Sequence, residues 1–409
     1  MKAERIKDIK DGIRREINGL AKNETATLLR TKFAKYIGKS DDQMPVESAA
    51  AILIWADGGF YDDSEEAIKL LQKARRLFRT LAENNRLLRV FERDALIVCG
   101  NVHKMTDDTR AAIRCYEEAI AHEQNRRRKA VGLLNMARCY MASNDLYQTM
   151  RIVERDWLLG IDDQRLSSYC TLLKARVLGI LGFADLCQST LQTMAAKRHP
   201  SAKIEVEWRY LVLYSGWKID EPQRFLDDGQ MFCAGLADIE NGRHQGFYEV
   251  ELGLHRLFCA SRSISNRAHF LERAKYLDED RNFMPTLELA DRFIFNIDKT
   301  DEVFPALLKS VTALLASGHH ELGQSLLVWM AAVLAERKKY YKLCDLLSAC
   351  RTYRDRLLVG FPKNFLYHFK SEVNRFDQFV QRMKDMIPPG VAGSDEKLGA
   401  WLHETAKHG

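Results

Sequence analysis

A pattern of small and large apolar residues occurs twice in succession between Leu96 and Val153. Each copy has the spacing of two amphipathic helices joined by a short polar turn. Small residues recur where the two helices of a pair must touch, and larger apolar residues lie one turn away. The first copy is formed by Leu96, Cys99, Gly100, His103, Ala112, Tyr116 and Ala119, and the second by Leu133, Met136, Ala137, Tyr140, Thr149 and Val153.

The repeated pattern resembles the tetratricopeptide repeat, a helix–turn–helix unit of about 34 residues. Its turns are Thr106-Asp107-Asp108 and Ser143-Asn144-Asp145. The bulky aromatic that opens the family's first helix is replaced by Leu96 or Leu133, and the closing proline is absent. The resemblance implies an all-α fold, a right-handed α-solenoid of helix pairs in which each repeat packs only on its neighbours.

Three segments are expected along the chain. Residues 1–40 form a basic N-terminal helical hairpin, residues 45–387 form the solenoid, and residues 388–409 form a Pro/Gly linker and a short amphipathic helix. Residues 1–40 contain 11 Lys or Arg and 5 Asp or Glu, so their net charge is +6. The hairpin either caps the solenoid with a solvated basic face or binds DNA. Its first helix carries the apolar stripe Ile6, Ile9, Ile13, Ile17 and Leu20 opposite Lys7, Lys10 and Arg14.

Composition places the chain among folded cytoplasmic proteins. Apolar residues make up 46% of the 409 residues and charged residues 29%. No segment approaches the run of about 18 apolar residues that a membrane span requires. The nine cysteines occur singly, without a C-x-x-C pair, which favours reduced and buried thiols over a disulfide framework.

Enzyme signatures are absent from the sequence. It contains no glycine-rich phosphate loop, no H-E-x-x-H and no G-x-S-x-G motif. His319 and His320 have no acid or thiol beside them at metal-ligand spacing. We therefore expect a non-enzymatic protein with no catalytic residues, no metal site and no cofactor.

The family resemblance also implies a concave groove lined by the first helix of each repeat. The residue after each small packing residue would point into this groove, which gives Asn101, Arg138 and Arg176, with Lys104 and Met141 one turn further along their helices. Such side chains could hold a peptide backbone together with an acidic side chain or a carboxylate, because arginine binds carboxylates bidentately. The alternative is ordinary salt bridging within the solenoid.

Two functional hypotheses follow. The first is a scaffold or receptor that binds a peptide or a partner protein in the groove, with an acidic partner as one option. The second is a peptide-responsive transcription regulator that binds DNA through its basic N-terminal helices. In its layout, the second resembles the peptide-responsive regulators of Gram-positive bacteria and their phages. Salt-dependent DNA binding would separate the two.

Overall fold

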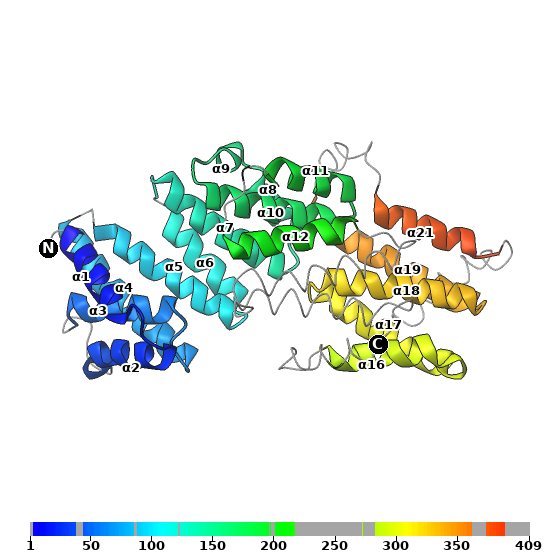
Figure 1. Cartoon of the computed structure of the whole chain (residues 1–409), viewed down its shortest axis with the longest axis horizontal. Helices are drawn as coiled ribbons and strands as arrows, with labels where there is room; N and C mark the ends of the chain where they lie inside the picture. Colours follow the sequence, from blue (N-terminus) through cyan, green and yellow to red (C-terminus); the bar gives the residue numbers. More distant parts are fainter. Residues whose placement is uncertain are drawn as a thin grey trace. The chain divides into compact units, whose positions relative to one another are not determined.

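The computed structural model of the chain describes residues 3–37, 44–85, 88–121, 123–195, 197, 201–216, 272, 283–361 and 374–388. These residues form α-helices and short 3₁₀ helices, and none of them lies in a β-strand (Figure 1). The all-α prediction is confirmed for this part of the chain. The handedness of the superhelix stays a prediction, and the expected C-terminal helix after Pro389 lies outside the described residues.

The chain divides into two compact units, Met1–Ser143 and Asn144–Gly409. In unit 1, each helix from α2 to α7 packs on the next one, and α3 also contacts α1 and α5. The elements of unit 1 are α1 (Ala3–Ile17), α2 (Lys22–Phe33), η1 (Ala34–Tyr36), α3 (Val46–Asp57), α4 (Ser64–Asn84), α5 (Arg89–Met105), α6 (Thr109–Ile120) and α7 (Arg126–Ala142).

Unit 2 continues the pattern of helices packed on their neighbours. Helix α10 contacts α8, α11 and α12, and helix α17 contacts α16, α18 and α19. The described elements of unit 2 are α8 (Leu146–Val153), α9 (Asp156–Leu159), α10 (Gln164–Ile180), α11 (Ala184–Ala195), α12 (Ala202–Gly216), α16 (Met284–Phe295), η4 (Ile297–Lys299), α17 (Thr300–Ala316), α18 (His320–Glu336), α19 (Tyr340–Leu357) and α21 (Arg375–Met386). None of the helices in the described ranges is long and apolar enough to cross a membrane.

Several turns between successive helices contain the same type of backbone hydrogen bond. The amide N–H of the third residue after the helix donates to the carbonyl five residues earlier, and the residue before the donor has a positive φ. This geometry satisfies carbonyls that the helix end leaves unpaired, and it reverses the chain within three residues. The donor–acceptor pairs are Phe60 and Trp55, Asp108 and His103, Phe183 and Leu178, His319 and Leu314, and Lys339 and Leu334.

Short polar side chains begin many of the helices. Asp108, in the first predicted turn, accepts a hydrogen bond from the Ala111 amide at the start of α6. Asp145, in the second predicted turn, caps α8 in the same way through the Gln148 amide. Such caps satisfy amide groups that have no partner within the helix, each contributing about 1 kcal/mol. The two turns identified in the sequence are therefore real helix boundaries.

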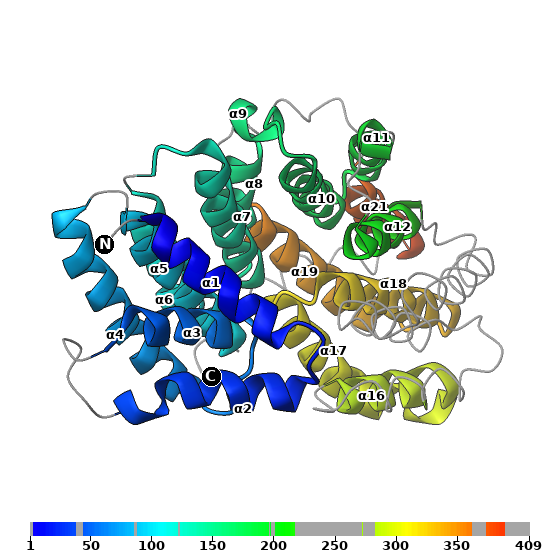
Figure 2. The same ribbon diagram turned by 60° about the vertical axis from the view of Figure 1, so that its left-hand side comes forward.

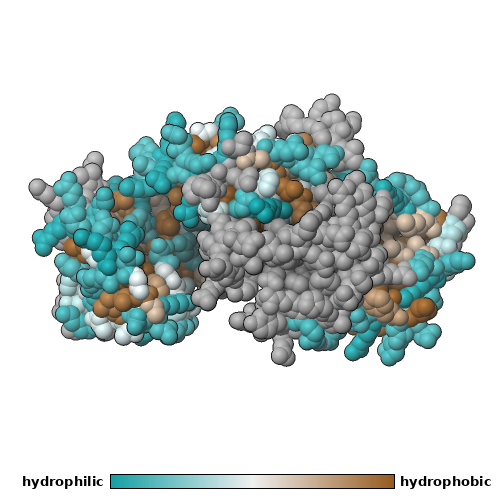
Figure 3. All heavy atoms as spheres, in the orientation of Figure 1, coloured by the Kyte–Doolittle hydropathy of each residue, from teal (hydrophilic) through white to brown (hydrophobic). Residues whose placement is uncertain are grey.

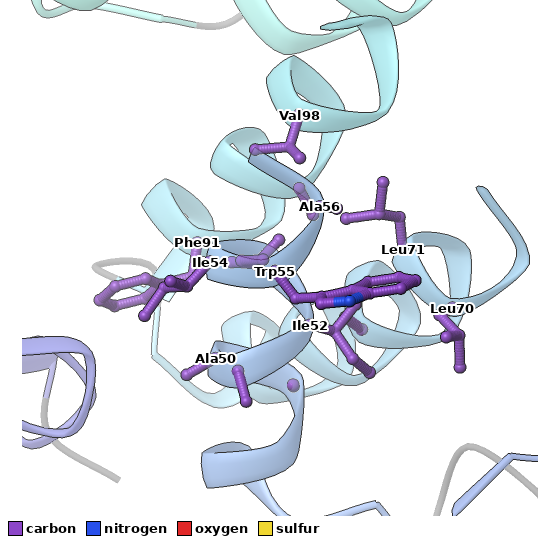
Figure 4. Packing of buried hydrophobic residues seen from close by; sticks show 14 of the residues in the cluster. Ala50, Ile52, Ile54, Trp55, Ala56, Leu70, Leu71, Phe91 and Val98 are labelled. Carbon is purple, nitrogen blue, oxygen red and sulfur yellow. The ribbon is translucent and has the colours of Figure 1, made fainter. Parts of the chain in front are cut away.

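The core of unit 1 is built around α3, which is apolar on every side. Its residues from Ala49 to Ala56 are all buried, as expected for a helix enclosed by its neighbours. Figure 4 shows Trp55 and Ile52 of this helix among residues of α4 and α5. The N-terminal hairpin packs on the same core, because Ile6 and Phe33 are fully buried in it. Helices α1 and α2 thus contribute directly to the core of unit 1.

A close crossing between α5 and α6 depends on Gly100. A Cβ atom at this position would lie 2.5 Å from Cε1 of Tyr116, whose ring is completely buried. The Tyr116 hydroxyl donates a hydrogen bond of 2.8 Å to Oδ1 of Asn101. The small residue therefore allows the aromatic ring of α6 to lie directly against the α5 backbone.

We predict that Gly100→Ala lowers the stability of the protein although alanine is the better helix former. The added methyl group must displace Tyr116, at a cost of about 1–3 kcal/mol, which outweighs a helix-propensity gain of about 1 kcal/mol or less. Gly12 lies inside α1 with no atom near the position of its missing Cβ, so Gly12→Ala is the matched control and should raise stability. Thermal and urea denaturation measure both changes. An equal gain in both variants would show that the crossing is loose.

Candidate functional site

An apolar groove lies between α17 and α19 in unit 2, and we call it the α17–α19 groove. Its volume is about 970 Å³, at the upper end of the range of typical ligand sites. Figure 2 shows the two helices close together, and they are in direct contact. The apolar residues that line the groove are Phe304, Pro305, Leu308, Ala313, Leu315, Ala316, Ala349, Tyr353 and Leu357.

The charged residues of the groove are mainly basic. Lys309, Lys342 and Arg356 line it together with a single acid, Asp345. Lys342 is engaged with Asp301, at 3.4 Å from its carboxylate. Lys309 and Arg356 are exposed, and neither has an ion-pair partner among the described residues. The groove therefore presents two uncompensated cations beside an apolar surface.

Asp345 is the one carboxylate in this lining. Burial raises its pKa, and the nearby Lys342 ammonium group opposes that shift. Thr312, Ser348 and Thr352 add hydroxyl groups to the same walls. Two of these hydroxyls donate to carbonyls one turn earlier in their own helices: Thr312 to Leu308, and Thr352 to Ser348. Their oxygen lone pairs remain able to accept hydrogen bonds.

A buried hydrogen-bond network holds Tyr353, part of the groove lining, in place. Its hydroxyl oxygen lies 2.8 Å from Nδ1 of the buried His320 and accepts a bond of 2.9 Å from Nε2 of Gln324. Gln324 also donates to the Ile180 carbonyl and accepts from the Tyr214 hydroxyl. These hydrogen bonds join four helices, α10, α12, α18 and α19. They hold the side of α19 that faces away from the groove in place.

A second hollow, of about 500 Å³, lies in unit 1. It is lined by residues of both charges, and four of these residues form two ion pairs. Lys10 of α1 contacts Asp94 at 2.8 Å, and Arg93 contacts the buried Glu123 at 2.8 Å. Burial raises the pKa of Asp57 in the same hollow. Four of the charged residues that line the unit 1 hollow are therefore paired with each other, and Arg128 is an exposed cation in the same lining.

The residues expected to line a concave groove have partners within the chain. Asn101 accepts from Tyr116 and lies 3.5 Å from Asp57, so its side chain links α3, α5 and α6. Lys104 and Arg138 are half-buried in unit 1, and each takes part in further interactions. Met141 is half-buried near the end of α7. These four residues belong to unit 1 and do not line its hollow.

Arg176, the fifth expected residue, belongs to α10 in unit 2. Its guanidinium lies 3.7 Å from Glu207 and 5.8 Å from the centre of the Tyr210 ring. Both partners lie on α12, so Arg176 helps to join α10 to α12. This is the salt-bridging arrangement left open as the alternative in the sequence analysis. The groove role of the five residues stays a prediction.

No protein-family model matches the chain, and no curated protein matches it. Among solved structures, the chain is similar to a Rap protein complexed with competence and sporulation factor. The two share 13% sequence identity, with a TM-score of 0.49 over 94% of this chain and 98% of the Rap chain. A likeness at this level says nothing about ligands, so the function is inferred below from the groove itself.

The α17–α19 groove was not anticipated from the sequence, although a periodic signal for it exists. On α19, Asp345, Ser348, Thr352 and Arg356 follow one another at intervals of three or four residues, and so do Pro305, Leu308, Thr312 and Ala316 on α17. Residues at this spacing share one helix face. The mixture of small, hydroxylated and charged residues is unusual for a buried face. Only the packing of α17 beside α19 turns the two faces into one groove.

We predict that Tyr353→Phe destabilises the protein while leaving the shape of the groove unchanged. The ring stays in place, but His320 and Gln324 each lose a buried hydrogen-bond partner, at a cost of about 1–3 kcal/mol. Tyr341 is on the same helix and is 77% exposed, so Tyr341→Phe is the control and should be neutral. Urea denaturation compares the two variants. Equal stability would mean that water replaces the lost hydroxyl.

Proposed function

We propose that this chain is a non-enzymatic scaffold or receptor that binds a peptide or a segment of a partner protein in the cytoplasm. Its helices would form tetratricopeptide-like pairs that wind into a right-handed solenoid. The observation that carries the proposal is the α17–α19 groove, where exposed Lys309 and Arg356 lie beside an apolar surface without anionic partners in the described part of the chain. An apolar surface with a few placed charges is typical of a binding site.

The chemistry of the groove favours an acidic peptide. Apolar side chains of the peptide would cover Phe304, Leu308 and Leu357, each buried methylene contributing about 0.8 kcal/mol. A carboxylate, from Asp, Glu or the peptide C-terminus, would pair with Arg356 or Lys309. Arginine is suited to this role because its planar guanidinium forms two parallel hydrogen bonds with a carboxylate. The hydroxyls on both walls could bind the peptide backbone.

Asn101, Lys104, Arg138, Met141 and Arg176 define the competing location for the same activity. Two observations weigh against a direct role for some of them. Asn101 accepts a hydrogen bond from Tyr116. Arg176 forms an ion pair with Glu207 and lies over the ring of Tyr210. Their replacement should therefore affect stability more than binding. The two sets of residues can be compared in one binding experiment.

We predict that Lys309→Ala combined with Arg356→Ala weakens peptide binding by tenfold or more. Each lost charge-assisted hydrogen bond contributes about 1.5–3 kcal/mol, and about 1.4 kcal/mol corresponds to a factor of ten. The probe is a fluorescent peptide with a free C-terminus, selected on the full-length protein from a randomised display library. Fluorescence anisotropy gives its affinity for the wild type and for the variants.

Three controls make this result specific to the groove. Arg351→Ala removes an exposed cation of α19 that does not line the groove, and it should leave the affinity unchanged. Ala313→Trp places a large ring in the groove and should abolish binding. An amidated copy of the peptide tests for recognition of the terminal carboxylate. Full affinity in both the double variant and Ala313→Trp would show that peptides bind elsewhere, and loss in Arg138→Ala with Arg176→Ala would identify the competing location.

The alternative function, DNA binding by residues 1–40, receives no support from the comparisons. Several cations of this segment are engaged within unit 1: Lys10 with Asp94, Arg30 with Glu66 and Lys32 with Glu16. We therefore expect no salt-dependent retention of the full-length protein on duplex DNA. Retention that falls steeply with salt, and that weakens on replacement of Lys7 by alanine, would support the regulator hypothesis instead.

A further inference from the structure

Two thiols and an imidazole come together on one side of the α5–α6 pair. The ligand atoms of Cys99, His103 and Cys115 all lie within 4.8 Å of one another. Cys99 is buried, and the other two residues are half-buried. This cluster lies in unit 1, apart from the groove argued above, and nothing in the proposed function uses it.

The fold explains why these three residues meet. Cys99 and His103 are four residues apart on α5, so they share one face of the helix. Cys115 lies on α6 directly before Tyr116, the residue whose ring lies against Gly100. The close crossing that requires Gly100 therefore also brings the Cys115 sulfur to the Cys99 sulfur. In the sequence these cysteines are single and separated, so the cluster has no recognisable spacing motif.

The surroundings of the cluster are those of a coordinating group. A carboxylate oxygen of Asp108 lies 3.5 Å from Nδ1 of His103, while the other oxygen of Asp108 caps α6. Metal-binding histidines commonly direct their second nitrogen toward a carboxylate, which fixes the ring and strengthens the ligand. The side chains of Cys99 and Cys115 are hydrogen-bonded to each other, and the guanidinium of Arg75 lies near both thiols. Arg75 is itself paired with Glu118.

We propose that Cys99, His103 and Cys115 bind one Zn²⁺ ion through two thiolates and Nε2 of the imidazole, with Asp108 orienting the imidazole. Two sulfurs and one nitrogen suit Zn²⁺, whereas Mg²⁺ and Ca²⁺ require oxygen ligands. Binding replaces the protons of both thiols, which pass to solvent, while the imidazole coordinates in its neutral form. The fourth position of the tetrahedron is open to water. The ion would fasten α5 to α6 across the crossing at Gly100.

The test uses full-length protein that has been reduced and freed of metal by dialysis against a chelator. Co²⁺ is the probe, because it replaces Zn²⁺ and its thiolate complexes absorb in the near ultraviolet and the visible. We expect one equivalent of Co²⁺ to produce thiolate-to-metal charge-transfer absorption, which Zn²⁺ then removes. Zn²⁺ should release about two protons per chain and raise the melting temperature, since it binds only the folded state.

Variants distinguish this site from a chance grouping of thiols. Cys115→Ser and His103→Gln should each weaken Co²⁺ binding at least tenfold. Asp108→Asn keeps a residue that caps helices well but removes the carboxylate, so it should weaken binding about ten- to a hundredfold. The matched control is Cys139→Ser, which replaces another buried thiol of unit 1 that lies outside the cluster. It should bind Co²⁺ as the wild type does.

Two outcomes would overturn the proposal. The first is a fully reduced wild-type protein that shows no charge-transfer absorption with Co²⁺, as expected if Cys99 and Cys115 serve only as a packed pair or as a disulfide. The second is loss of the signal in Cys139→Ser to the same extent as in Cys115→Ser. If a cysteine variant fails to fold, as judged by circular dichroism, the wild-type titration and Asp108→Asn still decide the question.

Discussion

The constraint on which the described structure depends is the reversal of the chain within three residues at the end of a helix. A helix end leaves carbonyl groups without partners. Here the amide of the third residue beyond the helix supplies one partner, and the residue before it adopts a positive φ. At two of these turns the residue with the positive φ is not glycine but Asp107 or Lys338. Each reversal places a helix antiparallel to the one before it, and packing along the length of both becomes possible.

The close packing of the helices determines which partners the polar side chains between them can reach. The crossing at Gly100 removes Tyr116 from solvent, so its hydroxyl must find a partner, and Asn101 provides it. The same crossing brings Cys99 and Cys115 together with His103. In unit 2, the buried His320 and the half-buried Gln324 bind Tyr353 and so fix one wall of the α17–α19 groove. At both sites, buried polar groups find hydrogen-bond partners, because an unpaired buried polar group costs about 1–3 kcal/mol.

Unit 2 also contains contacts between segments far apart in the chain. The Asn374 side chain donates to the carbonyl of Leu181, and the Arg375 amide donates to the carbonyl of Gly182. A Cβ at Gly182 would lie 2.6 Å from the Asn374 side chain. The turn between α10 and α11 is thus also the attachment point of α21. Figure 3 shows hydrophilic residues over much of the described surface of both units.

The sequence by itself indicated the helix pairs between Leu96 and Val153, the two turns within them and the close crossing at Gly100. These features depend on local spacing: a small residue at Gly100, a cap at Asp108 or Asp145, and apolar residues every three or four positions. It also indicated the all-α class. It did not locate the α17–α19 groove or the cluster of Cys99, His103 and Cys115, because each combines faces of different helices. Only the tertiary structure decided which cations keep no partner, since Arg176 meets Glu207 while Arg356 has no ion-pair partner among the described residues. A side chain's charge is fixed by its sequence, whereas its availability to a ligand is fixed by what packs beside it.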